Sequence, residues 1–247
     1  MRIFITGISS GIGRALARQT VAAGHEVWGI ARRAELLDEL KREFTAPHFI
    51  TSQCDVDDVA AMRAVAAAMR EAGWEPDAVI LNAGVYFADG GEGFRFDAHR
   101  STFGVNVDGA LFWVAEWLPD FLRRRAGAFI AISSTAALRP SGSAYYSASK
   151  AALSMAFRQL RLSFADNGVT FSTMHFGPID TDMWQGRRMF LVASAADAAA
   201  AALRLLERPA GSYFFPFVST WLLRLSSLVP DRVFLFVSRL VLKRVRE

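Results

Sequence analysis

The sequence has a single cysteine and lacks a recognisable leader segment. Cys54 is the only thiol among 247 residues, so no intrachain disulfide can form, which is typical of a protein in a reducing compartment. The chain starts directly in the apolar segment 2–6, with no basic n-region and no cleavage site. These two features predict a cytoplasmic protein.

Metal-ligand patterns, a charge excess outside the C-terminal tail and long apolar runs are also missing. The four histidines, His25, His48, His99 and His175, lack metal-ligand spacing, so we interpret them as structural and expect no metal. The net charge is +4, and residues 211–247 account for it with six Lys/Arg against Asp231 and Glu247. The basic pI therefore describes a tail, and no nucleic-acid partner is expected. No uncharged apolar run in that tail reaches the roughly 18 to 20 residues that span a bilayer.

Strand-like and helix-like segments alternate along most of the chain, in which 52% of residues are hydrophobic. The expected strands cover residues 2–6, 26–31, 48–53, 78–81, 128–133, 168–175 and 213–217. The expected helices cover residues 14–23, 34–44, 56–72, 96–125, 145–166 and 195–207, the fourth being interrupted around 103–109. This order predicts an α/β domain whose parallel sheet has right-handed crossovers and helices on both faces. We assign residues 1–217 to this domain and 218–247 to a helical tail.

A glycine-rich turn, Gly7-Ile8-Ser9-Ser10-Gly11-Ile12-Gly13, follows the first strand and precedes the first helix. In this arrangement backbone N–H groups and the helix N-terminus bind a pyrophosphate. The spacing is G-x-x-x-G-x-G, and glycine turns also occur as plain strand-to-helix links. The position after the first strand favours nucleotide binding.

The second strand ends at Ala31 and is followed by Arg32 and Arg33, without a carboxylate. In a dinucleotide-binding fold this corner faces the adenosine ribose, where a carboxylate binds NAD and an arginine accommodates the 2′-phosphate of NADP. The alternative is that both arginines simply begin a solvated helix. We expect NADP(H) to be preferred, with NAD(H) as the alternative.

Tyr146 and Lys150 are spaced to meet on one helix face, since they lie four residues apart. A phenol has a pKa of about 10, and a nearby ammonium stabilises its phenolate and so lowers that pKa. Tyr145 is excluded from this pairing because its i+4 neighbour is Ser149. A Tyr/Lys pair also occurs by chance on many helices, so the interpretation depends on the rest of the chain.

Further polar segments follow the expected strands in order: Asp55-Val56 after the third, Asn82-Ala83-Gly84 after the fourth, Asn106-Val107-Asp108-Gly109 within the interrupted helix, and Ser134 after the fifth. With the glycine turn and the Tyr146/Lys150 pair, these segments resemble the short-chain dehydrogenase/reductase superfamily over roughly residues 1–210. The resemblance implies a single Rossmann-type doubly wound parallel sheet of about seven strands, plus the C-terminal helical extension. It also implies a homodimer or homotetramer.

The resemblance implies a role for each of these residues. Ser134 binds the substrate oxygen, Tyr146 exchanges a proton with it, Lys150 also holds the nicotinamide ribose, and Asn106 anchors a water that links Lys150 to solvent. The implied catalytic residues are Ser134, Tyr146, Lys150 and Asn106. The implied cofactor-binding residues are Gly7, Ser9, Ser10, Gly11, Ile12, Gly13, Arg32, Arg33, Asp55, Val56, Asn82, Ala83, Gly84, Tyr146, Lys150, Ile179 and Thr181.

Two positions depart from the family pattern. The family serine usually lies thirteen residues before the tyrosine, which here is Ser133, whereas Ser134 fits the strand-end pattern better. We choose Ser134 and assume a one-residue deletion in the loop 138–144. The usual Pro-Gly after the sixth strand is replaced by Phe176-Gly177, which leaves the approach to the carboxamide less rigid.

The C-terminal part favours an apolar partner. Residues 182–192 hold an apolar lid that suits either a hydrophobic substrate or packing on the body: Met183, Trp184, Met189, Phe190 and Leu191. The tail from residue 218 reads as two apolar helices broken at Pro230 and interleaved with arginines. Such helices lie in a membrane interface, cover an active-site mouth or form a dimer contact. Peripheral contact with the inner membrane surface is therefore one interpretation.

Three functions remain as hypotheses. The first is an NADP-dependent oxidoreductase that interconverts a hydrophobic, lipid-like ketone or aldehyde and its alcohol. Reduction is favoured with NADP because cells keep that pool reduced. The second is a non-catalytic nucleotide-binding regulator, against which the four catalytic residues argue, and the third is an NAD-dependent secondary-alcohol dehydrogenase.

Overall fold

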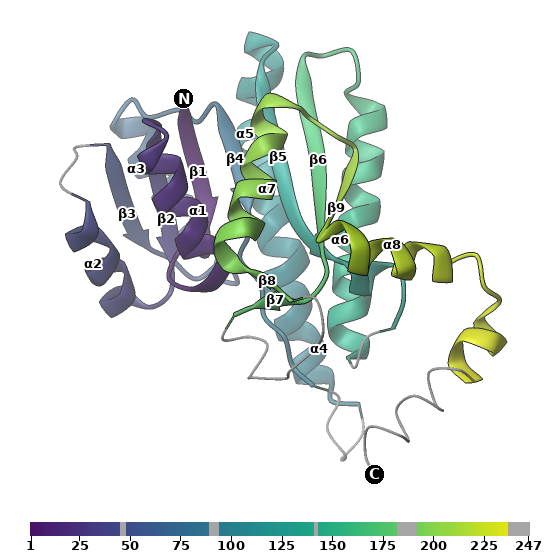
Figure 1. The fold of residues 1–247 in the computed structure, drawn as a ribbon. Helices are drawn as coiled ribbons and strands as arrows, with labels where there is room; N and C mark the ends of the chain where they lie inside the picture. Colours follow the sequence, from purple (N-terminus) through teal and green to yellow (C-terminus); the bar gives the residue numbers. More distant parts are fainter. Residues whose placement is uncertain (45–47, 89–93, 141–142, 182–191, 237–247) are drawn as a thin grey trace.

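The computed structural model describes residues 1–44, 48–88, 94–140, 143–181 and 192–236. Its centre is one seven-stranded parallel sheet with the order β3-β2-β1-β4-β5-β6-β9 (Figure 1). The strands are β1 (Arg2–Thr6), β2 (Glu26–Ala31), β3 (Phe49–Gln53), β4 (Ala78–Leu81), β5 (Gly127–Ser134), β6 (Val169–Phe176) and β9 (Ser212–Phe215). This sheet confirms the predicted Rossmann-type architecture.

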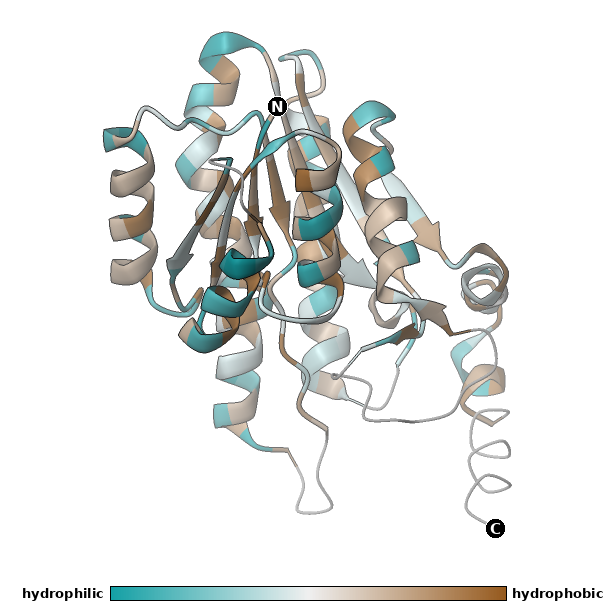
Figure 2. Ribbon diagram, turned by 60° about the vertical axis from the view of Figure 1, so that its left-hand side comes forward, coloured by the Kyte–Doolittle hydropathy of each residue, from teal (hydrophilic) through white to brown (hydrophobic). Residues whose placement is uncertain are grey.

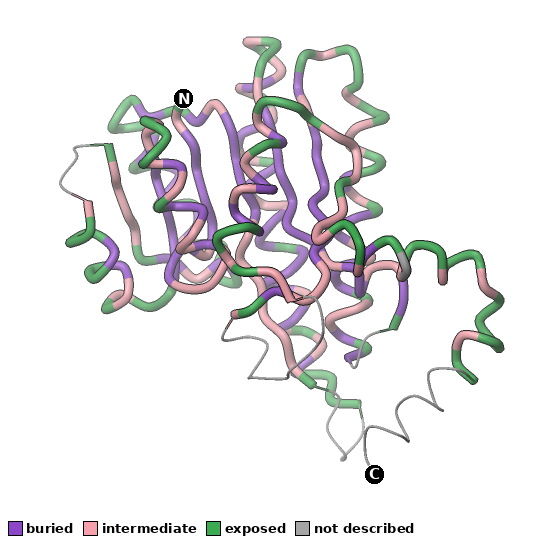
Figure 3. Tube along the Cα trace, viewed as in Figure 1, coloured by how far each residue is buried: buried purple, intermediate pink, exposed green. Residues whose placement is uncertain are grey.

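Helices cover both faces of the sheet, as parallel crossovers require. They are α1 (Gly11–Ala22), α2 (Ala34–Glu43), α3 (Val59–Glu71), α4 (Phe96–Phe103), α5 (Gly109–Arg124), α6 (Ala144–Ser163) and α7 (Ala195–Glu207). One buried cluster joins the sheet to α1, α2 and α7, and the other joins it to α3, α5 and α6. The strands therefore carry mostly apolar side chains on both faces, and they form the buried centre of the molecule (Figures 2 and 3).

Local hydrogen bonding explains where the structure and the sequence-based helix boundaries differ. The helix expected from residue 56 begins at Val59, because the Asp58 carboxylate accepts the N–H groups of Ala60 and Ala61. The interruption expected around 103–109 is a single π-helical segment, Gly104–Asp108, between α4 and α5. A short parallel pair, β7 (Ile179–Asp180) and β8 (Ala193–Ser194), was not predicted.

The described part of the tail contains α8 (Phe217–Ser226) and a helical segment over residues 231–236, with Pro230 between them. This agrees with the predicted break at Pro230. Among the described residues, no helix combines the length and the apolar composition needed to cross a bilayer.

Arg139 fastens this tail to the body. It lies in the segment after β5, and only 9% of it is exposed. Its guanidinium donates to the carbonyl oxygen of Ser226 and, over 2.6 Å, to that of Val229; it also pairs with the Asp231 carboxylate. The ring of Phe234 lies 4.6 Å from its central carbon. One side chain of the body thus holds both sides of the Pro230 break.

We expect Arg139→Met to lower the free energy of unfolding by about 1 to 3 kcal/mol, because the partly buried carbonyl groups of Ser226 and Val229 lose their donor. Asp231→Asn is the matched control, and it should cost under about 1 kcal/mol because the Asp231 side chain is 84% exposed. Urea unfolding measures both values, and limited proteolysis reports release of the tail. Equal losses in the two variants would show that the surface ion pair, and not the buried donor, holds the tail.

Candidate active site

The turn between β1 and α1 has the geometry of a phosphate cradle. Gly7 and Gly11 have φ values of +74° and +53°, a region that favours glycine. A Cβ added at Gly13 would lie 2.0 Å from the Gly7 carbonyl oxygen, so the turn closes tightly on itself. The side chain of the N-cap residue Ser10 does not cap α1. The first N–H groups, at the positive end of the helix dipole, are therefore available to bind an anion.

Arg33 extends this cradle toward the end of β2. Its Nη2 donates to the hydroxyl oxygens of Ser9 and Ser10 over 2.9 and 2.7 Å. Arg32 points elsewhere, with a nitrogen 3.6 Å from the Asp55 carboxylate. One cation and two hydroxyls at the turn, together with the uncapped helix end, form a donor set that fits the phosphates of a dinucleotide.

Asn82 ties the end of β4 to the same turn. Its side-chain amide donates to the carbonyl oxygens of Thr6 and Gly7, both over 3.0 Å. The Thr6 hydroxyl oxygen accepts the N–H groups of Asn82 and Ala83 over 3.0 Å. These four bonds fix the spacing of β1 and β4 beside the glycine turn.

The other predicted cofactor residues are divided between this site and the core. Thr181 is at the site, because the Cβ position of Gly11 lies 3.2 Å from its methyl carbon. Ile12 and Ile179 pack on the α1/α7 side of the sheet, and Val56 belongs to the opposite core cluster. The predicted apolar lid at 182–191 lies outside the described residues.

Ser134 and Tyr146 are hydrogen-bonded to each other. Tyr146 is in the first turn of α6, where the Ser143 hydroxyl oxygen accepts its backbone N–H over 3.2 Å. Ser133 faces away, since its hydroxyl lies 2.8 Å from the Ser154 hydroxyl and is 3% exposed. Alternation along β5 therefore brings Ser134, and not Ser133, to the tyrosine.

Lys150 lies one turn after Tyr146 on α6 and is 4% exposed. Its Nζ donates to the Ile132 carbonyl oxygen over 2.8 Å and lies 5.7 Å from the centre of the Tyr146 ring. Burial lowers its pKa from 10.5 to about 8. The Cβ position of Gly84 would be 3.4 Å from Nζ, so glycine there leaves room for the ammonium.

The direction of the Tyr146 pKa differs from the sequence-based expectation. Burial raises the pKa of Tyr146, the Ser134 hydrogen bond lowers it by less, and nearby Tyr86 raises it further. The Lys150 ammonium is not among the causes; its one described bond is to a backbone carbonyl. The phenol therefore keeps its proton at neutral pH.

Asn106 occupies the π-helical segment and satisfies its amide fully. Its Oδ1 accepts the Val85 N–H over 2.8 Å, and its Nδ2 donates to the Val85 carbonyl oxygen and to the Ser149 hydroxyl over 3.1 and 3.0 Å. Asn106 thus joins the π-helical segment, the residue after Gly84 and helix α6 in one hydrogen-bonded network. The Cβ position of Gly84 would contact Oδ1 at 3.3 Å, which places Asn106 beside Lys150.

Sequence reasoning did not find Tyr86. Its ring meets the Tyr146 ring edge-on, with centroids 5.3 Å apart. It follows the Asn82-Ala83-Gly84 segment by two residues, which is the signal that could have identified it. The Tyr86 ring, in the segment after β4, thus flanks the protonated Tyr146 phenol.

The fold and site place this chain in a class of proteins, the nicotinamide-dependent oxidoreductases with a Rossmann-type sheet. The family model described as short chain dehydrogenase matches residues 1–191, and the chain belongs to that family. It is an oxidoreductase that binds a nicotinamide dinucleotide.

Three similar proteins illustrate the range of relatives. An uncharacterized oxidoreductase of Mycobacterium tuberculosis is 29% identical over 246 aligned residues, which cover 94% of this chain and 95% of the relative. The 2,3-dihydro-2,3-dihydroxybenzoate dehydrogenase of Escherichia coli is 32% identical over 182 aligned residues, which cover 73% of this chain and 70% of the relative. A short-chain dehydrogenase structure from Streptomyces avermitilis has a TM-score of 0.85 at 25% identity, covering 99% of this chain and 98% of that one. The first and third similarities extend beyond residue 191 into the tail.

Proposed function

We propose that the protein is an NADPH-dependent reductase that converts a hydrophobic ketone or aldehyde into an alcohol in the cytoplasm. The observation that carries this proposal is the half-buried Tyr146 phenol, which keeps its proton and is hydrogen-bonded to Ser134. Reduction of a carbonyl needs a proton donor at the substrate oxygen, and a protonated phenol is such a donor. A bound nicotinamide dinucleotide would supply the hydride.

Each polar side chain has a separate task in this mechanism. The Ser134 hydroxyl orients the substrate oxygen toward Tyr146, and Tyr146 donates its proton to that oxygen. Lys150 holds a positive charge near the phenol, which favours the phenolate left behind. Asn106 fixes the backbone at Val85 and the Ser149 hydroxyl, and so keeps α6 in place against β4.

Arg33 and the glycine turn support NADP(H) as the preferred dinucleotide. The Arg33 guanidinium already lies against the hydroxyls of Ser9 and Ser10, and the end of β2 has no carboxylate to bind a ribose hydroxyl. Arg32 is 61% exposed in its side chain and pairs with the Asp55 carboxylate, and it adds a second guanidinium beside the end of β2. Two cations favour the doubly charged 2′-phosphate over a neutral hydroxyl.

We expect the double change Arg32→Ala and Arg33→Ala to weaken NADPH binding by roughly 10²- to 10⁴-fold, because charge-assisted hydrogen bonds to a phosphate contribute about 1.5 to 3 kcal/mol each. NADH affinity should change by less than about threefold. Nicotinamide fluorescence titration measures both constants, with Arg42→Ala on the exposed side of α2 as the control. Tighter binding of NADH than of NADPH by the unchanged protein would refute the preference.

The apolar residues near the C-terminus suggest a lipid-like substrate and a peripheral contact with the inner membrane surface. Exposed apolar side chains of the tail support this contact: Phe217, Val218, Trp221, Leu225, Leu228, Val233, Leu235 and Phe236. We also propose that residues 218–247 act as a unit added to the catalytic domain 1–217, and that the protein is a homodimer or homotetramer. NADPH oxidation with ketones and aldehydes of graded chain length tests the substrate class, and rates that fall with chain length would contradict it.

A further inference from the structure

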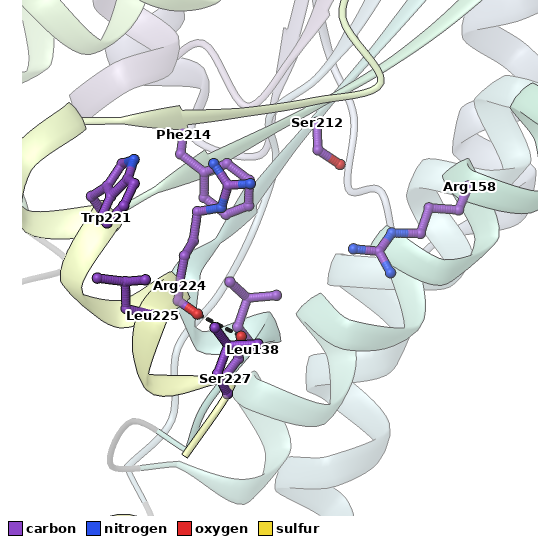
Figure 4. A pocket seen from close by; sticks show the side chains of 9 residues that line it. Leu138, Arg158, Ser212, Phe214, Trp221, Arg224, Leu225 and Ser227 are labelled. Atoms are coloured by element: carbon purple, nitrogen blue, oxygen red, sulfur yellow. Dashed lines mark hydrogen bonds between the residues drawn. The ribbon is translucent and has the colours of Figure 1, made fainter.

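A groove with a volume of about 440 Å³ lies between α6, β9 and α8, apart from the catalytic residues (Figure 4). Its apolar wall includes Leu138, Trp221, Leu225 and Leu228. Ser134, Tyr146, Lys150 and Asn106 do not line it. The mechanism above leaves this groove unused.

Two guanidinium groups enter the groove from different elements. Arg158 extends from α6 and Arg224 from α8, and both line the hollow (Figure 4). Arg224 lies over the Phe214 ring, with its central carbon 4.4 Å from the ring centre. Within the described part of the chain, neither guanidinium forms an ion pair, and no Asp or Glu lines the groove. The groove therefore presents two uncompensated positive charges.

The layer behind these arginines adds no negative charge. His175 is fully buried on β6 and stacks on Phe214, with ring centroids 4.5 Å apart. Burial, together with the nearby charges of Arg158, Arg224 and Lys150, lowers the pKa of His175 to about 4. The imidazole is therefore neutral and adds no charge of its own, so both guanidinium charges are uncompensated. An anion in the groove would supply the missing charge.

The wall of the groove is also the exposed apolar face of α8. Leu228 is 81% exposed, Trp221 45% and Leu225 43%, although all three line the groove. Phe217 continues the same surface at the start of α8 and is 68% exposed. In Figure 3 the tail projects from the body as a mostly exposed segment. Apolar side chains therefore surround a cationic hollow that opens to the outside.

This combination matches the interface of an anionic membrane. Apolar and tryptophan side chains insert between lipids, while arginines meet phosphate groups at the surface. A second copy of this chain fits less well, because the Arg158 and Arg224 guanidinium groups of one copy would face like charges on the other. A nucleic acid would satisfy the arginines and leave the apolar side chains in water.

We propose that the groove between Arg158 and Arg224 binds the phosphate headgroup of an anionic phospholipid while the exposed face of α8 lies in the membrane interface. This inference rests on the peripheral membrane contact proposed above and adds a specific headgroup site to it. The site does not depend on NADPH preference or on turnover.

Vesicle sedimentation of the full-length protein tests this site. Vesicles of phosphatidylcholine alone are compared with vesicles that also contain phosphatidylglycerol. The unchanged protein should sediment with the anionic vesicles and remain in solution with the neutral ones. The double change Arg158→Gln and Arg224→Gln should weaken binding by roughly tenfold to thirtyfold, since each arginine near the surface contributes about 1 kcal/mol.

Arg42→Gln with Arg63→Gln is the matched control, because it removes the same charge from exposed positions on α2 and α3. This control should bind within about twofold of the unchanged protein. Equal losses in the two double variants would show that only net charge matters and would overturn the headgroup site while leaving membrane contact intact. If the unchanged protein binds neither vesicle, both the headgroup site and the membrane contact are wrong. Changes in α8 that then alter the oligomeric state would identify a second copy as the partner of this surface, and changes that alter DNA binding would identify a nucleic acid. NADPH oxidation in solution should be equal in the unchanged protein and the two double variants. This assay tests the reductase proposal independently of vesicle binding.

Discussion

Tyr146→Phe is expected to lower kcat by about 10³-fold while leaving NADPH affinity unchanged. General acid catalysis contributes roughly 10² to 10⁴ in rate, and this change removes the proton donor while keeping the aromatic ring. The ring contacts with Tyr86 and with Lys150 at 5.7 Å should persist. Steady-state kinetics on the best ketone, with dinucleotide binding measured by fluorescence, separates the chemical step from binding.

Tyr145→Phe is the matched control for this loss. Tyr145 is the preceding residue and is 1% exposed, and its hydroxyl oxygen accepts the Arg95 N–H over 2.5 Å. Losing that bond should cost about 1 kcal/mol of stability and leave kcat within about threefold. Comparable kcat losses in both variants would mean that the α6 N-terminus is disturbed generally and that Tyr146 has no special chemical role.

Lys150→Met is expected to lower kcat/KM by about 10²-fold and to change the pH dependence of stability. The charge near the phenol disappears, while an unbranched chain of similar length still fills the buried space. In the folded protein the Lys150 pKa is about 8, against 10.5 for a free lysine. Between these values the unfolded chain binds more protons than the folded one, so stability rises with pH.

The rise attributable to Lys150 should amount to about 3 kcal/mol from pH 8 to pH 10.5. It should be absent in Lys150→Met. Urea unfolding across this pH range measures the difference between the two proteins. Lys41→Met is the control, because Lys41 is half exposed on α2 and should keep the rise. Parallel pH profiles for the unchanged protein and Lys150→Met would show that the buried ammonium does not have a lowered pKa.

The strands were the part of the fold that the sequence predicted best. The bounds of β1, β2 and β4 agree with the expected ranges, because these strands are short, apolar and followed by polar turns. Helix ends were less predictable, since they depend on single side-chain caps such as Asp58. The β7/β8 pair was missed because two-residue strands leave no periodic pattern.

Within the site, the sequence predicted which residue types meet but not how their charges are balanced. The i,i+4 spacing correctly placed Lys150 beside Tyr146 on α6. It could not show that burial raises the Tyr146 pKa, since burial depends on elements distant in the chain. Arg139 was missed for the same reason, because its partners lie about 90 residues further along the sequence.

The tail shows a second limit of the sequence-based prediction. The break at Pro230 follows from the missing N–H of proline, so it could be predicted. The groove beside α8 could not, because Arg158 and Arg224 belong to segments that the fold alone brings together (Figure 4).

The proposed mechanism depends on direct transfer of a proton from Tyr146 to the substrate oxygen. The most direct measurement is the pH profile of the single-turnover rate of NADPH oxidation with a hydrophobic ketone. We expect the rate to be constant through neutral pH and to fall only above the raised pKa of the phenol, and we expect Tyr146→Phe to remove that fall together with most of the rate. A rate that increases as a group with a pKa below neutrality loses its proton would contradict the claim, because the proton donor would then be a different residue.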